Sequence, residues 1–250
     1  MDRRAAIAWL ATAVVGGCGG GGSAVESPAP SATGANGSSP APVPAPAPAP
    51  APSSSPASAP VGLSPNIAAW GDSLTPAFAA NLQLLYPGRT VYDGGVNGQT
   101  STQIAARQLA DTAGRNTWIN VFWYGQNNVT QPAQIKADLA ASIAALAPGN
   151  ARFLVLSVVN EATPIASKGG ADYATIVQLN AELGALYPQN FFDIRSYLVS
   201  LYDPTNAQDV ADFASGDVPS SLRLDIIHLD NNGSVAVAKK VKELIDAKGW

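Results

Sequence analysis

The chain has 250 residues, a formal net charge of −4 at pH 7 and 46% hydrophobic residues. A chain of this length and composition can form one globular domain with a sizeable core. Its acidic balance argues against the class of proteins that bind nucleic acids through a basic surface, so we expect no nucleic-acid partner.

Residues 1–17 have the features of an export signal. Arg3 and Arg4 precede an apolar run of about eleven residues, which suits a signal peptide and is too short to span a membrane. The run ends in Val-Gly-Gly-Cys, which resembles the lipobox of bacterial lipoproteins. This resemblance implies that Cys18 carries a lipid, becomes the mature N-terminus and anchors the protein to a membrane. We therefore predict an exported protein of the bacterial cell envelope, in the periplasm or on the outer surface.

The segment at 18–62 separates this signal from the rest of the chain. It contains one charged residue and no aromatic or long aliphatic side chain, and much of it alternates proline with alanine. Such a segment cannot bury a core, so we predict a disordered spacer leading to a domain at 63–250. Two alternatives for Cys18 stay open: an ordinary cleaved signal that ends beside a cysteine, and a free thiol. Cys18 is the single cysteine, which excludes an intramolecular disulfide.

From residue 63 onward, short apolar strand patterns alternate with amphipathic helix patterns. The predicted strands cover 67–70, 90–92, 118–124, 153–159 and 191–194, and the predicted helices cover 77–85, 102–112, 133–146, 173–186 and the C-terminus. This alternation predicts an α/β fold, a three-layer α/β/α sandwich with a mainly parallel sheet of about five strands.

The polar residues that follow the strands form an unusual set. Ser73 follows the first predicted strand, the segment 93–101 follows the second, and 125–128 follows the third. The segment 224–233 stands near the end of the chain. Because chemistry in such folds gathers at the carboxyl ends of the strands, we expect these segments to lie close together.

His228 is the only histidine, and Asp225 stands three residues before it. Imidazole is the natural general base near neutral pH, and a carboxylate on its other nitrogen fixes its tautomer. A metal site is the alternative, but with no second histidine it would have to be completed by carboxylates alone. The arrangement predicts a serine nucleophile with a histidine base and no metal.

The chain carries four motifs in order over residues 66–245: Gly-Asp-Ser at Ser73, a loop glycine, Gly-Gln-Asn-Asn and Asp-x-x-His. In these motifs it resembles the SGNH or GDSL-type hydrolase superfamily. The resemblance implies a flavodoxin-like sandwich in which Ser73 is the nucleophile, His228 the general base and Asp225 its orienting partner. It further implies an oxyanion hole made by the backbone N–H groups of Ser73 and Gly98 and the side-chain amide of Asn127. Gly95 is the rival glycine in the second loop.

The chain departs from the superfamily pattern at two places. Asn128 stands where the family usually has Asp, and Leu229 stands where it usually has Pro. Neither change removes a residue of the predicted triad or oxyanion hole, and Asn128 is expected to alter either the support available to Asn127 or the position of the substrate. Asp72 is interpreted as structural, with a carboxylate that accepts from local backbone N–H groups.

These residues predict an ester hydrolase that forms an acyl-enzyme and needs no cofactor. By resemblance, its substrates are small acyl groups on glycans, or lipid and aryl esters, and we expect a monomer. The alternative is a non-catalytic, envelope-anchored glycan-binding module that kept the fold. The chain has neither Gly-x-Ser-x-Gly nor the Gly-rich phosphate-binding loop, which excludes the enzyme classes that carry those motifs.

Overall fold

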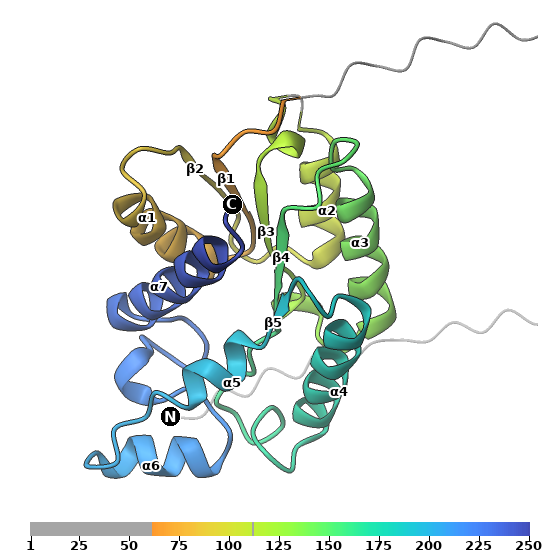
Figure 1. The fold of residues 1–250 in the computed structure, drawn as a ribbon. Helices are drawn as coiled ribbons and strands as arrows, with labels where there is room; N and C mark the ends of the chain where they lie inside the picture. Colours follow the sequence, from red (N-terminus) through yellow and green to blue (C-terminus); the bar gives the residue numbers. More distant parts are fainter. Residues whose placement is uncertain (1–61, 112) are drawn as a thin grey trace, which may run out of the picture. The chain divides into compact units, whose positions relative to one another are not determined.

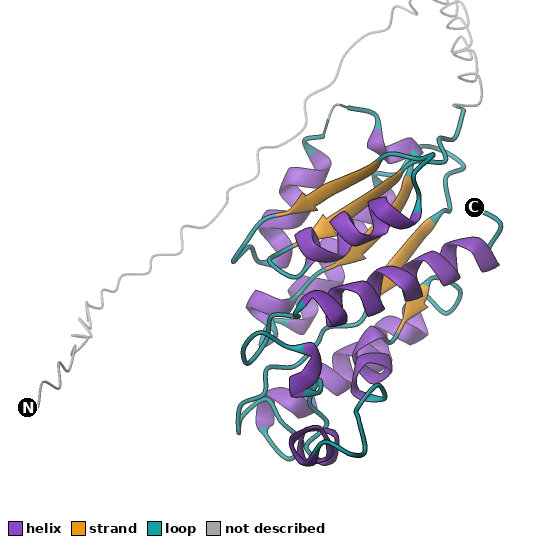
Figure 2. Ribbon diagram, turned by 90° about the vertical axis from the view of Figure 1, so that its left-hand side faces the viewer, coloured by secondary structure: helices purple, strands orange, loops and turns teal. Residues whose placement is uncertain are grey.

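The computed structural model describes residues 62–111 and 113–250, and its core is one five-stranded parallel sheet. The strand order is β2-β1-β3-β4-β5, and Figure 2 shows the arrows side by side and pointing the same way. The strands are β1 (Ile67–Gly71), β2 (Val91–Gly95), β3 (Ile119–Trp123), β4 (Phe153–Leu156) and β5 (Phe191–Phe192). The predicted α/β sandwich is confirmed, whereas the signal peptide, Cys18 and the spacer lie outside the described residues.

Helices cover both faces of this sheet (Figure 1). One face carries α1 (Thr75–Leu85), α5 (Ile194–Val199) and α7 (Asn231–Ala247), and the other carries α2 (Ser101–Leu109), α3 (Pro132–Ala144) and α4 (Ala171–Leu186). A further helix, α6 (Ala207–Ala214), packs against a 3₁₀ turn at Ser220–Leu222. No helix within 62–111 or 113–250 is both long and apolar enough to span a membrane.

Strand β1 shows why the sheet is buried on both sides. All five of its residues are buried, with Ile67 and Ala69 in the core under α1 and α7, and Ala68 and Trp70 in the core under α2 and α3. Successive side chains of a strand point to opposite faces, so a strand between two helical layers must be apolar at every position. This double burial fixes the position of the residues that follow β1.

Helix α6 was not predicted from the sequence because its polarity is reversed. Its carboxylates Asp209 and Asp212 are buried, whereas Val210 and Phe213 are 42% and 44% exposed. An amphipathic pattern normally places apolar side chains inward, so the sequence at 203–219 looked like a polar loop. The buried carboxylates belong to a hydrogen-bond network beside the candidate site.

Strand β4 is shorter than predicted, because the side chain of Asn180 takes over the backbone groups beyond it. The expected strand at 153–159 ends at Leu156. The amide oxygen of Asn180 accepts from the Val158 N–H, and its amide nitrogen donates to the Val158 carbonyl, each at 2.9 Å. Val158 therefore has its backbone groups satisfied without a neighbouring strand, and the chain is free to leave the sheet.

Gly71 is required where β1 turns into α1. A Cβ atom built there would lie 2.1 Å from the Thr75 hydroxyl and 2.8 Å from the Trp123 carbonyl oxygen. We predict that Gly71→Ala lowers the free energy of unfolding by about 2 kcal/mol or more in urea denaturation, because backbone and helix must shift to admit the methyl group. Gly88→Ala is the matched control, since nothing lies within 4 Å of its added Cβ. Equal stability of the two variants would contradict this interpretation.

Candidate active site

The candidate site lies at the end of β1, from which the chain first builds the sheet to one side with β2 and then to the other side with β3. Strand β1 pairs with β2 on one side and β3 on the other, and Gly71 is in register with Gly95 and Trp123. Ser73, Gly98 and Asn127 each follow one of these three strand ends within a few residues. In open parallel sheets this switch point is the usual place for a ligand.

The structure brings Ser73, His228 and Asp225 into one hydrogen-bonded chain. His228 Nε2 lies 3.0 Å from Ser73 Oγ, and His228 Nδ1 lies 2.8 Å from Asp225 Oδ2. When Nδ1–H donates to the carboxylate, Nε2 is left as the acceptor for the Ser73 hydroxyl proton. The arrangement can therefore remove a proton from Ser73 and stabilise the imidazolium that results.

Asp225 is held in place by its own backbone turn. Its Oδ1 atom accepts from the backbone N–H groups of His228 at 2.7 Å and Ile227 at 2.8 Å. The His228 backbone donor, the Ile227 donor and then the His228 ring lower the pKa of Asp225 to about 2. The carboxylate therefore stays ionised across the neutral range, as the partner of an imidazolium must.

Arg223 clamps the loop that carries Asp225. Its guanidinium donates to the carbonyl oxygens of Val218 and, at 3.0 Å, Asp225, and it forms a salt bridge of 3.1 Å with Asp212 on α6. The Arg223 and Asp212 side chains of this bridge are only 10% and 8% exposed. The roles of Arg223 and Asp212 could not be predicted from the sequence, because nothing in the local pattern distinguishes them from surface charges. Only the reversed polarity of α6 reveals their role.

Asp72 immediately precedes Ser73 and is 1% exposed. Its Oδ1 atom accepts from the Leu74 backbone N–H at 3.1 Å, in line with the structural role inferred for it. Its Oδ2 atom is buried and has no hydrogen-bond partner among the described residues. Burial raises the pKa of Asp72 to about 6, while the Leu74 hydrogen bond and the charge of His228 act in the opposite direction.

The second loop distinguishes Gly98 from its rival Gly95. The Gly95 N–H already donates to Asp93 Oδ1 at 2.8 Å, and a Cβ there would meet the Pro76 ring at 2.5 Å. Gly98 has a φ of +74° and open space around its Cα. Gly95 therefore serves the packing of β2 against Pro76 at the start of α1, and Gly98 is the glycine with room for a ligand beside it.

Asn127 joins the third loop to the second. Its side-chain amide donates to the Gln99 carbonyl oxygen at 2.9 Å, directly beside Gly98. Asn127 itself is exposed. The structure thus places Asn127 and Gly98 on adjoining loops next to the turn that carries Ser73.

Asn128, the departure from the superfamily pattern, makes bonds that an aspartate could not all make. Its Oδ1 atom accepts from the Ser101 backbone N–H at 3.1 Å, and its Nδ2 atom donates to the Ser101 hydroxyl at 2.9 Å. That hydroxyl donates in turn to Asp138 Oδ2 at 2.6 Å. Because Ser101 gives its proton to Asp138, a donor rather than a second carboxylate is needed at 128. The network holds the third loop against the start of α2.

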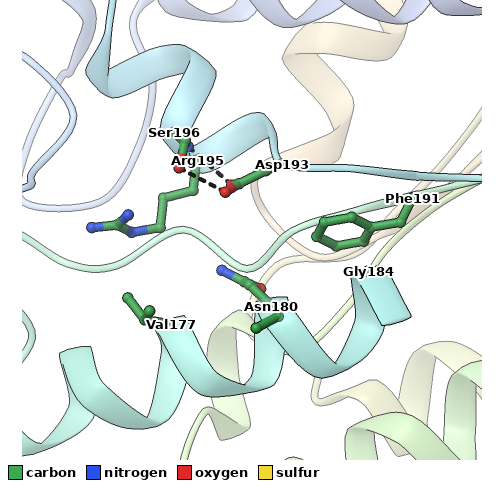
Figure 3. Close-up of a pocket in the computed structure, with 8 residues that line it drawn as sticks. Val177, Asn180, Gly184, Phe191, Asp193, Arg195 and Ser196 are labelled. Atoms are coloured by element: carbon green, nitrogen blue, oxygen red, sulfur yellow. Dashed lines mark hydrogen bonds between the residues drawn. The ribbon is translucent and has the colours of Figure 1, made fainter. Parts of the chain in front are cut away.

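A pocket of about 250 Å³ lies elsewhere, between α4, β5 and the start of α5 (Figure 3). None of the predicted site residues lines it, and its Asp193 carboxylate already accepts from the Ser196 N–H and hydroxyl at 3.0 and 2.6 Å. Across the described part of the chain, no group of three or more His, Cys, Asp or Glu side chains is arranged to hold a metal ion.

Comparison with solved structures agrees with this fold. A Bacteroides fragilis protein provisionally assigned as an acylhydrolase has a TM-score of 0.58 and 15% identity, covering 73% of this chain and 87% of its own. The acetyl xylan esterase AlAXEase has a TM-score of 0.57 and 16% identity, covering 72% and 99%. A protein provisionally assigned to the G-D-S-L lipolytic family, from Desulfitobacterium hafniense, has a TM-score of 0.55 and 13% identity, covering 72% and 98%. The predicted resemblance to SGNH/GDSL-type hydrolases is confirmed at the level of the fold.

Sequence comparison gives a more limited match. No protein-family model matches the chain. Among curated proteins, the tail spike protein of Salmonella phage epsilon15 is 30% identical over 145 residues, which is 53% of this chain. The chain spans 13% of the length of that protein, so the similarity concerns one part of it.

The raised pKa of Asp72 predicts a pH-dependent cost of folding. Below about pH 4 the carboxyl is protonated in both folded and unfolded chains, and no cost arises; above about pH 6 the folded chain must bury its charge. In Asp72→Asn, which keeps an acceptor for Leu74 but cannot ionise, the stability gain over wild type should grow by about 2 to 3 kcal/mol between pH 4 and pH 8. Urea denaturation across this range measures it, and a pH-independent difference would refute the assignment.

Proposed function

We propose that the chain is a serine ester hydrolase. Ser73 Oγ attacks the ester carbonyl carbon while His228 Nε2 takes its proton. The tetrahedral intermediate collapses to an acyl-enzyme, and the alcohol leaves with the proton from His228. A water molecule then attacks the acyl group, gives its proton to His228 and releases the acid, after which the proton returns to Ser73.

One observation carries this proposal: the continuous chain from Ser73 Oγ through His228 to Asp225, with contacts of 3.0 and 2.8 Å. These are the distances that proton transfer from a nucleophile to a base requires. The low pKa of Asp225 supports it, because an ionised carboxylate stabilises the imidazolium formed in each half-reaction.

The oxyanion of the tetrahedral intermediate would be held by the backbone N–H groups of Ser73 and Gly98 and by the Asn127 amide. The open space at Gly98 and the bond from Asn127 to the adjoining Gln99 carbonyl support these assignments. Donors fixed in this way stabilise the developing negative charge without reorganising during the reaction.

The substrates belong to the broad class of acyl esters. Solved structures with this fold include an acetyl xylan esterase and proteins provisionally assigned as an acylhydrolase and a lipolytic protein, which favours O-acylated glycans or lipid esters. A lipid on Cys18, as expected from the sequence, would hold the protein at a bacterial membrane, where either substrate occurs.

The test is hydrolysis of p-nitrophenyl acetate by the full chain. We expect Ser73→Ala to lower kcat by about 10⁴-fold or more, because removal of the nucleophile eliminates the acyl-enzyme route. Ser200→Ala, which removes an exposed hydroxyl on a different segment, should retain wild-type turnover. A folded wild type that neither hydrolyses the ester nor reacts with a fluorophosphonate at Ser73 would instead favour a glycan-binding module.

Arg223 is expected to act as a positioning residue for Asp225. We predict that Arg223→Gln lowers kcat about 10- to 100-fold with KM changed less than twofold, because the guanidinium bonds the loop but is not placed on the substrate. Arg223→Lys keeps the charge beside Asp212, so its kcat should lie between those of the wild type and Arg223→Gln. The steady-state parameters for p-nitrophenyl acetate measure both variants.

The matched control is Arg152→Gln. Arg152 also donates to two backbone carbonyls, those of Ser64 and Thr117. These residues precede β1 and β3, at the amino ends of the strands and away from the site. Its loss should reduce stability without a comparable fall in kcat. If Arg223→Gln and Arg152→Gln change only stability, and by similar amounts, Arg223 has no positioning role.

A further inference from the structure

Two large apolar side chains stand in solvent on either side of Asp225. Leu224 is 75% exposed and Ile226 is 48% exposed. Single exposed apolar residues are common on protein surfaces and do not by themselves indicate a binding site. Here two of them flank the residue that hydrogen-bonds the proposed base, on the loop closest to where the leaving group must sit.

The loop that carries them is rigid, so their exposure does not come from a frayed segment. The Leu224 N–H donates to the His228 carbonyl at 2.7 Å, and Arg223 pairs with Leu229 in an antiparallel bridge. The Ile226 carbonyl accepts from the Ala162 N–H at 2.8 Å, which ties the loop to the segment after β4. These bonds hold both side chains open beside the site.

The segment tied to Ile226 adds a third apolar side chain. Ile165, three residues beyond Ala162, is 56% exposed. The same segment is also held by hydrogen bonds to the buried Asp217 carboxylate, which accepts from Ser167 Oγ and Asn160 Nδ2. The segment next to the His228 loop therefore adds a third exposed aliphatic side chain to Leu224 and Ile226.

The mechanism decides which part of an ester meets these side chains. His228 Nε2 must hand its proton to the leaving oxygen, so the alcohol portion lies on the His228 side of Ser73. The carbonyl oxygen points toward the loops of Gly98 and Asn127, which would supply the donors for the oxyanion. Leu224 and Ile226 share a five-residue loop with His228 and therefore lie on the same side of Ser73 as the alcohol portion.

We infer that Leu224 and Ile226 select esters of apolar alcohols, an inference that rests on the proposed hydrolase function. A sugar alcohol brings several hydroxyl groups that need hydrogen-bond partners. The one charged side chain of the loop, Asp225, already has its Oδ1 and Oδ2 atoms bonded to Ile227 and His228. The loop can therefore bury aliphatic surface of the alcohol, while its polar side chains, Asp225 and His228, are already bonded to each other and to Ser73.

The test uses ethyl, butyl and hexyl acetate, whose alcohols have similar reactivity and differ in apolar length. Full burial of one methylene group is worth about fourfold, so partial burial of four predicts a hexyl-to-ethyl ratio of kcat/KM on the order of tenfold for the full chain. Leu224→Ser and Ile226→Ser should each lower this ratio at least about threefold. Acid release in a pH-stat measures all three esters.

Leu84→Ser is the matched control, because Leu84 is 77% exposed near the far end of α1 and away from the site. It should leave the ratio at the wild-type value. The inference is overturned if both loop variants keep the wild-type ratio, or if the wild type prefers an acetylated methyl xyloside to hexyl acetate. Absence of ester turnover and of fluorophosphonate labelling would instead overturn the hydrolase function and this inference with it.

Discussion

The hydrogen bond between His228 and Ser73 is the contact on which the rest of the site depends, because it joins two residues 155 positions apart in the chain. A bond of this kind tolerates only small errors of position, so both of its ends must be fixed independently. Ser73 is fixed by β1, which is buried on both faces. The strand ends at Gly71, where a Cβ atom would clash with Thr75 and Trp123. His228 has no strand beneath it and is fixed by polar contacts within the loop and behind it.

Those polar contacts explain the reversed helix α6. Asp212 receives the Arg223 guanidinium, and Asp209 accepts from the backbone N–H and hydroxyl of Ser221 and from the hydroxyl of Ser220. Buried carboxylates are tolerated only when such donors surround them, and here the donors lie on the segment leading into the Asp225 loop. The charged side of the helix thus faces inward, where it bonds the segment that leads into the Asp225 loop. Its apolar side faces outward as a result.

The strands and the grouping of Ser73, Asp225 and His228 could be predicted from the sequence for a physical reason: both are encoded locally or by short motifs. Apolar runs such as 67–70 indicate buried strands directly, and His228 with Asp225 forms a pattern that a single loop can satisfy. Other roles could not be predicted in this way, because each depends on partners from distant segments. These are the roles of Arg223, Asp212 and the Asn128–Ser101–Asp138 network. Helix α6 was missed because its pattern follows a polar interior rather than the apolar core. The end of β4 was missed because a side chain, Asn180, replaces a strand neighbour.

The division between fixed and variable parts of the site bears on substrate choice. The groups that perform the proposed chemistry sit directly on strand ends or in tightly bonded turns, and the same fold recurs in proteins only 13 to 16% identical to this chain. The side chains that would meet the substrate beyond its ester bond stand on loops, where sequence changes cost little stability. A shared fold therefore says little about which alcohol the proposed reaction would release. The aliphatic groups beside His228 are a property of this chain, and they are better evidence on the alcohol than the sugar esters associated with a structural neighbour.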